Sequence, residues 1–132
     1  MSSLSNLQVL IIDDNPDHQE ILEYNLNKIP DFHAQITKTL NLAEGLKAFK
    51  EKQFDLVFLD MNLPDSSVDQ TVPKFLEKRS HSVPIIVMSS LHQNIMLRGI
   101  PIEASTFHLS KTDLSPEILQ SVLEQAIEST EL

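Results

Sequence analysis

The sequence predicts an α/β fold in which a doubly wound parallel sheet lies between two layers of helices. Apolar runs of strand length alternate with segments of helix length, and this alternation repeats five times along the 132 residues. Three of the runs are apolar almost throughout, as strands buried on both faces of a parallel sheet are. Four of the runs stop at a charged or hydroxyl side chain. These observations indicate a (βα)5 three-layer sandwich.

The expected strands lie near residues 8–13, 32–38, 55–60, 84–89 and 106–110. The first, third and fourth are the apolar runs, and they end at Asp13, Asp60 and Ser89. The second run alternates apolar with polar residues, and the fifth is short, mixed and followed by Lys111. The second and fifth are therefore expected at the edges of the sheet. With right-handed crossovers this gives the flavodoxin-like strand order 2-1-3-4-5.

The expected helices lie near residues 16–29, 42–52, 69–79, 90–98 and 115–129. The first begins at Pro16 after a capping Asn15, and the last begins in the same way at Ser115 and Pro116. The last helix also carries apolar residues at helical spacing. We expect one domain over residues 1–132, since this length is ordinary for a single core.

The chemistry is expected at the carboxyl ends of the strands. Ligands of such sheets bind there, near the switch between strands one and three, where Asp13, Asp14 and Asp60 would meet. Two unit charges ~5 Å apart repel by roughly 3 kcal/mol at an effective dielectric of ~20. Mg²⁺ relieves that repulsion and prefers such oxygen ligands. Asp60 is then a candidate nucleophile toward phosphorus, with Lys111 as a positive charge and Ser89 as a hydrogen-bond donor.

These segments together resemble the receiver domain (CheY-like) of the two-component response-regulator family. The resemblance runs through residues 9–14, 56–64, 84–89 and 107–111 and covers nearly the whole chain. Any one of the four motifs is weak, but four in this order at strand ends are specific. The resemblance implies a phosphorylation-dependent signalling module of a phosphorelay.

The resemblance also implies a role for each residue at the phosphorylation site. Asp60 is the phosphoacceptor and takes phosphate from a sensor histidine kinase or phosphotransfer protein. The Mg²⁺ cofactor is held by Asp13, Asp14, Asp60 and the main-chain carbonyl of Asn62. The module catalyses only its own phosphorylation and dephosphorylation, so it is not expected to be an enzyme in the ordinary sense.

The output of the module is implied in the same way. Lys111 contacts the phosphoryl group, Ser89 moves toward it, and His108 occupies the place of the switch aromatic. The partner-binding face is formed by the fourth expected helix, the fifth strand and the fifth helix. The downstream target or output domain is open, as is whether the receiver stands alone or belongs to a longer regulator.

Four residues depart from the family pattern without removing a phosphorylation residue. Val68 stands where the family usually has Gly, and Ser90 stands where a small apolar residue or Gly is common. His108 replaces a Tyr or Phe. Thr112 replaces a proline that is usually joined by a cis bond, and since a non-proline cis bond costs roughly 3 kcal/mol, we predict a trans bond here.

Composition excludes several other classes of function. The net charge of -9 argues against direct binding of nucleic acid or of an anionic membrane. No cysteine is present, so thiol chemistry and disulfides are excluded. No apolar stretch is long enough to span a membrane and no signal peptide precedes the first strand, so we expect a cytoplasmic location. The five histidines lack the spacing of metal ligands.

Two alternatives remain open at this point. The chain could be a receiver that binds partners independently of phosphate. It could also be a small aspartyl-phosphate phosphatase, because Asp60, Met61 and Asn62 faintly resemble the Asp-x-Asp motif of haloacid-dehalogenase-like enzymes. The second acid of that motif is absent, and the chain has no room for a cap domain.

Overall fold

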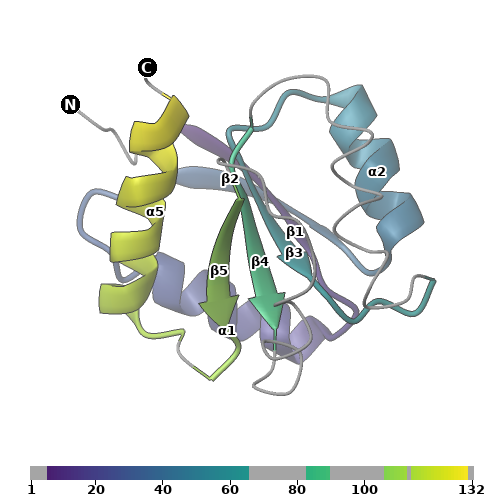
Figure 1. The fold of residues 1–132 in the computed structure, drawn as a ribbon, viewed down its shortest axis with the longest axis horizontal. Coiled ribbons are helices and arrows are strands. Elements are labelled where there is room, and N and C mark those ends of the chain that lie inside the picture. The colour runs from purple at the N-terminus through teal and green to yellow at the C-terminus, as the bar shows by residue number, and fades with distance from the viewer. Residues whose placement is uncertain (1–5, 66–82, 90–105, 113, 131–132) are drawn as a thin grey trace.

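A five-stranded parallel sheet forms the centre of the molecule (Figure 1). The computed structural model describes residues 6–65, 83–89, 106–112 and 114–130. The strands are β1 Leu7–Ile12, β2 Ala34–Thr39, β3 Leu56–Asp60, β4 Ile85–Ser89 and β5 Thr106–Ser110. Their order is β2-β1-β3-β4-β5. The predicted strand order is therefore confirmed, and the predicted strand bounds agree to within two residues.

Three helices cover the sheet within the described part of the chain. They are α1 Pro16–Leu26, α2 Leu42–Glu51 and α5 Pro116–Thr130. α1 ends three residues earlier than predicted: Asn27 is its C-cap, and the N–H groups of Lys28 and Ile29 donate to carbonyls three residues back instead of four. The helices predicted at 69–79 and 90–98, and the departures at Val68 and Ser90, lie outside the described residues.

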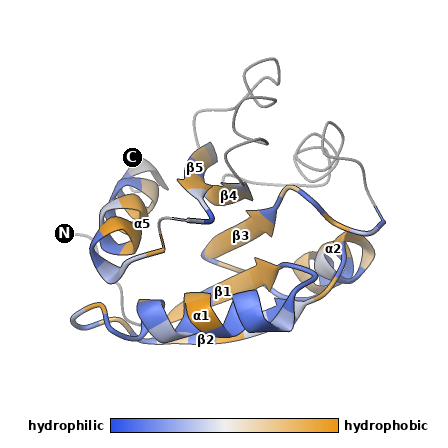
Figure 2. Cartoon of the chain, turned by 90° about the horizontal axis from the view of Figure 1, so that it is seen from below, coloured by the Kyte–Doolittle hydropathy of each residue, from blue (hydrophilic) through white to orange (hydrophobic). Residues whose placement is uncertain are grey.

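Successive residues of the strands divide the core into two layers, because side chains alternate between the faces of a sheet. Val9 and Ile11 of β1 pack with apolar side chains of α1 and α5 on one face. Leu10 and Ile12 pack on the other face with Leu42 of α2. β3 and β4 alternate in the same way. Figure 2 shows that the strands are mostly apolar, whereas the helices carry both hydrophilic and hydrophobic residues.

Local capping explains where the helices begin. Asn15 accepts hydrogen bonds from the main-chain N–H groups of Asp17 and His18 at the start of α1. Asn41 accepts from Glu44 N–H at the start of α2, and the Glu44 carboxylate accepts from Leu40 N–H in return. Both loops that follow β1 and β2 are thereby closed tightly, which fixes the carboxyl edge of the sheet.

Candidate functional site

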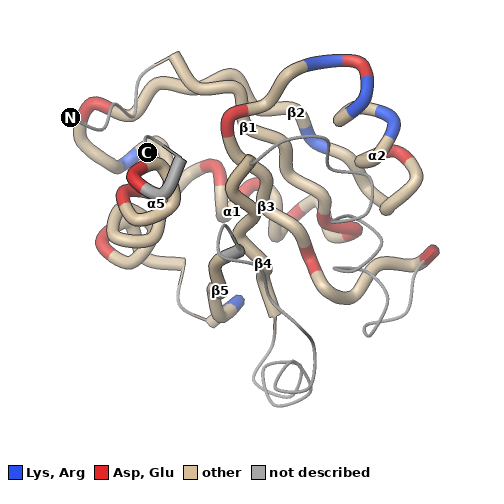
Figure 3. The backbone as a smooth tube through the Cα atoms, turned by 45° about the horizontal axis from the view of Figure 1, so that its top comes forward, with Lys and Arg blue, Asp and Glu red and all other residues tan. Residues whose placement is uncertain are grey.

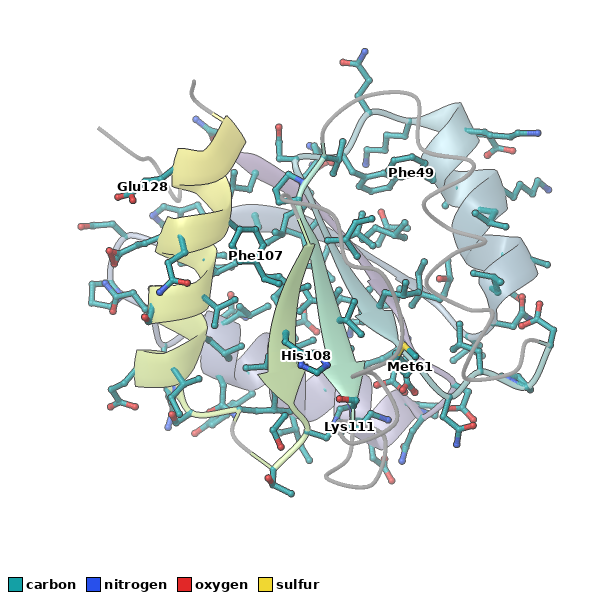
Figure 4. The ribbon with its side chains drawn as sticks, in the orientation of Figure 1. Phe49, Met61, Phe107, His108, Lys111 and Glu128 are labelled. Carbon is teal, nitrogen blue, oxygen red and sulfur yellow. The ribbon has the colours of Figure 1, made fainter. Side chains whose placement is uncertain are left out.

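The carboxyl ends of four strands bring the predicted site residues to one edge of the sheet. Asp13 and Asp14 follow β1, Asp60 ends β3, Ser89 ends β4 and Lys111 follows β5. β1 and β3 are neighbours in the sheet, which places the two predicted metal-binding segments side by side. Figure 4 shows Lys111 at the end toward which the arrows of β4 and β5 point.

Asp60 is fully buried, and its two carboxylate oxygens differ in their surroundings. Oδ1 accepts a hydrogen bond from Asn62 N–H at 3.0 Å and lies 2.9 Å from Lys111 Nζ. Oδ2 is buried and has no hydrogen-bond partner among the described residues. Burial raises the pKa of Asp60 from 3.8 to about 6, against the opposing effects of Asn62 and Lys111.

Asp13, Asp14 and Asp60 form an acidic cluster. One carboxylate oxygen from each lies within 4.8 Å of the others, with Asp13 and Asp60 buried and Asp14 exposed. Burial raises the pKa of Asp13, but hydrogen bonds from His18 and Asn15 and the charge of Lys111 outweigh burial and hold that pKa below 3.8. The cluster therefore keeps a negative charge on Asp13 beside the buried Asp60.

The acidic cluster fits a divalent cation. Its ligand atoms are carboxylate oxygens, the donor type that Mg²⁺ prefers. Asp60 Oδ2 is a buried acceptor without a donor among the described residues, and a bound cation would satisfy it. Asn62 donates its main-chain N–H to Asp60 Oδ1, which holds the residue that carries the predicted carbonyl ligand next to Asp60. Figure 3 shows basic residues gathered around α2, whereas Lys111 lies at this edge of the sheet, after β5.

The main chain at Asp13 is fixed by the buried side chain of Gln19. The Gln19 Nε2 group donates to the carbonyl of Asp13 at 2.9 Å and to that of Thr39 at 2.8 Å. The N–H of Asp13 donates to the same Thr39 carbonyl at 3.1 Å. Gln19 of α1 thus links the carboxyl ends of β1 and β2 through hydrogen bonds, and one of its partners, Asp13, belongs to the acidic cluster.

Ser89 and His108 lie on neighbouring strands, as predicted for a switch pair. Ser89 is buried, and its Oγ lies 3.4 Å from Nε2 of His108, whose side chain is exposed. The bond between Lys111 and Thr112 is trans, because no cis peptide occurs among the described residues. The predicted trans bond is therefore confirmed.

Three contacts at the site were missed by sequence reasoning. Gln19 lies on the buried stripe of α1 with Leu22 and Leu26, and a polar residue on such a stripe is a usable signal. His18 Nδ1 lies 2.5 Å from Asp13 Oδ2, and nothing in its spacing indicated this. Asp65 accepts hydrogen bonds from two N–H groups at the start of α2, across 22 and 23 residues.

One known protein family matches most of the chain. The family described as the response regulator receiver domain matches residues 9–123. The chain belongs to the response regulator receiver family. Receiver domains of response regulators are signalling modules that interact with histidine kinases and output domains. The predicted family and fold class are confirmed.

Curated relatives of this receiver domain occur in staphylococci. Sensory transduction protein LytR of Staphylococcus haemolyticus is 29% identical over 128 residues, which are 96% of this chain and 49% of that protein. The protein of the same name in Staphylococcus saprophyticus subsp. saprophyticus is 30% identical over 126 residues, covering 94% and 48%. The receiver domain thus spans about half the length of the curated relatives it matches.

Solved receiver domains share the fold. A response regulator receiver domain protein from Clostridium thermocellum has a TM-score of 0.71 at 19% identity, covering 95% of this chain and 97% of that one. The receiver domain of a signal transduction histidine kinase from Syntrophus aciditrophicus has a TM-score of 0.74 at 16% identity, covering 94% and 92%. Within the described residues of the present receiver, no helix has the length and apolarity needed to cross a bilayer.

Proposed function

We propose that this receiver domain accepts a phosphoryl group on Asp60 from the phosphohistidine of a sensor histidine kinase or phosphotransfer protein. The observation that carries the proposal is the buried Asp60 carboxylate, with Lys111 Nζ 2.9 Å from Oδ1 and no partner at Oδ2 among the described residues. A buried carboxylate that is held in place and only partly neutralised is suited to attack an electrophile.

The transfer replaces one bond to phosphorus by another. An Asp60 oxygen forms a bond to phosphorus while the bond from phosphorus to the donor histidine nitrogen breaks, and the leaving imidazole takes up a proton. Lys111 provides a positive charge beside the phosphoryl oxygens. Asp13, Asp14, Asp60 and the Asn62 carbonyl would hold Mg²⁺, which supplies further charge neutralisation when bound.

The switch proposed here begins at Ser89. Phosphorylation adds strong acceptor oxygens near the ends of β3 and β4, and the Ser89 hydroxyl donates to one of them. His108, 3.4 Å from Ser89 in this structure, then changes its position and alters the surface near β5. We propose that this surface, together with α5 and the helix expected at residues 90–98, contacts the downstream target.

We propose a cytoplasmic module, formed by residues 1–132 as a single domain, that acts through protein contacts rather than by binding nucleic acid or membrane directly. The excess of 19 acidic over 10 basic residues supports this choice of partner. The name shared by the two staphylococcal relatives, sensory transduction protein, supports a role in sensory signalling.

Phosphorylation with a small phosphodonor tests the assignment of Asp60. We expect the purified chain to gain one phosphoryl group, measured by intact-protein mass spectrometry, when it is incubated with acetyl phosphate and Mg²⁺. Asp60→Asn should gain none, since the amide is no nucleophile, and Lys111→Ala should react more slowly because the neutralising charge is lost. Glu51→Gln, at an exposed position of α2, is the matched control and should react like wild type.

Two results would contradict the proposal. If the wild type remains unmodified, or if Asp60→Asn is labelled equally, Asp60 is not the acceptor. A partner that binds equally with and without beryllofluoride would instead favour a receiver that acts independently of phosphate. Turnover of a generic phosphate ester would favour the phosphatase alternative.

A further inference from the structure

His18 reaches back from the first turn of α1 to the carboxylate of Asp13. Its Nδ1 lies 2.5 Å from Asp13 Oδ2, and the two side chains are 16% and 1% exposed. A carboxylate only accepts hydrogen bonds, so the imidazole nitrogen at this distance is the donor. The contact therefore joins a nearly buried histidine to a buried member of the acidic cluster.

All polar groups of Asp13 have partners in the structure. Oδ1 accepts from Asn15 N–H at 3.0 Å, and the main-chain N–H and carbonyl are bound to Thr39 and Gln19. His18 Nδ1 is the partner of Oδ2. The main chain is fixed by its own contacts, so the plane of the carboxylate is set by two donors, Asn15 N–H at Oδ1 and His18 at Oδ2.

We propose that His18 is a positioning residue, which holds the Asp13 carboxylate in the orientation that binds Mg²⁺. A carboxylate oxygen has two lone pairs, so Oδ2 can accept from His18 and still bind a cation. Hydrogen bonds of this kind orient metal ligands in many sites. The inference rests on the proposed function, because it assumes that the acidic cluster holds the cation.

His18 itself is not the ligand. The oxygens that converge within 4.8 Å come from Asp13, Asp14 and Asp60, and no His18 atom joins that group. The second ring nitrogen, Nε2, is buried and has no hydrogen-bond partner among the described residues. Mg²⁺ also prefers oxygen over imidazole nitrogen. His18 therefore acts through Asp13.

Isothermal titration calorimetry tests the inference. Mg²⁺ alone is titrated into the protein, without any phosphodonor. His18→Leu keeps a side chain of similar size but removes the donor, and its Mg²⁺ affinity should fall about 10- to 100-fold. His18→Asn places an amide N–H close to the position of Nδ1, and its affinity should stay within a few-fold of wild type. His18→Gln places its amide one bond further out and should lose affinity as His18→Leu does.

Several outcomes separate this inference from the proposed function. If wild type binds no Mg²⁺, the proposed function fails and the inference fails with it. If wild type binds and folded His18→Leu binds equally well, only the inference fails. Equal losses in His18→Asn and His18→Leu would also overturn it, because the donor would then not matter. Circular dichroism of each metal-free variant verifies folding, and His18→Gln replaces His18→Leu if the latter does not fold.

Discussion

Asp60 combines full burial with a charge that its surroundings only partly neutralise. A paired buried carboxylate still loses its hydration, and the ion pair with Lys111 offsets only part of that loss. The raised pKa of about 6 expresses this balance. At neutral pH the carboxylate is mostly ionised, so it can act as a nucleophile while remaining poorly solvated.

The pKa of Asp60 predicts how stability depends on pH in the metal-free protein. Because the folded-state value of about 6 lies above 3.8, the folded state binds more protons between these values, and ionised Asp60 destabilises the fold as pH rises through 6. Asp60→Asn lacks this titration. We expect its stability relative to wild type to increase by about 1 kcal/mol between pH 5 and pH 7.5, measured by urea unfolding with a chelator.

The neighbouring Asp13 does not obscure that measurement. Its pKa is lowered below 3.8, so the stability it contributes is lost only as pH falls through a more acidic range. A difference between wild type and Asp60→Asn that stays constant from pH 5 to pH 7.5 would show that burial does not shift the pKa of Asp60.

At the scale of elements, the approach of α2 to β1 depends on Gly45. A Cβ atom at this position would lie 2.4 Å from Cδ1 and 2.7 Å from Cγ1 of Ile12, which is fully buried. The absence of a side chain at Gly45 therefore lets α2 lie directly against the strand that leads into Asp13. Glycine inside a helix costs roughly 1 kcal/mol relative to alanine, and the close packing offsets that cost.

Gly45→Ala should destabilise the protein although alanine favours helices. Overpacking costs typically about 1–3 kcal/mol, and the gain of ~1 kcal/mol in helix propensity reduces the net loss to between about 0 and 2 kcal/mol. Lys47→Ala, at an exposed position of the same helix, should change stability by less than about 0.5 kcal/mol. Urea unfolding measures both.

The origin of the loss can be checked separately with Ile12→Val, which removes Cδ1, the nearest atom. If the clash causes the loss, the double variant should be more stable than the sum of the single changes predicts. A strictly additive result, or a stabilised Gly45→Ala, would mean that α2 moves away from β1 at little cost.

The elements were predictable because apolar runs and caps are local signals. The strand order followed from which runs were apolar throughout, and the acidic cluster followed from the carboxyl ends of neighbouring parallel strands. Asp65 at the start of α2 was not predictable, since its partners lie more than 20 residues away and depend on how the loop after β3 folds. The orientation of His18 depended equally on tertiary packing.

At the scale of the molecule, folding gathers negative charge in a chain that already carries a net charge of -9. The acidic cluster exists only when β1 and β3 lie side by side, so a cation held by it binds the folded state and hardly the unfolded chain. Folding and metal binding are therefore expected to be coupled.

Mg²⁺ should raise the midpoint of thermal unfolding of the wild type. A concentration 100 times the dissociation constant adds about 2.7 kcal/mol to the free energy of unfolding. Asp14→Asn removes a ligand at an exposed position, so it should fold normally and show a smaller increase. Sodium chloride at matched ionic strength controls for screening. An equal increase with either salt would indicate that no specific site exists.

The junction of β1, β2 and α1 protects one main-chain amide whose hydrogen exchange can be measured. The N–H of Asp13 is bound to the Thr39 carbonyl, and Gln19 covers the same carbonyl. The amide proton of Asp13 can therefore exchange with deuterium only when this junction opens. The exchange rate of that single amide therefore reports how readily the ends of β1 and β2 separate next to the acidic cluster, and it can be measured without a binding partner.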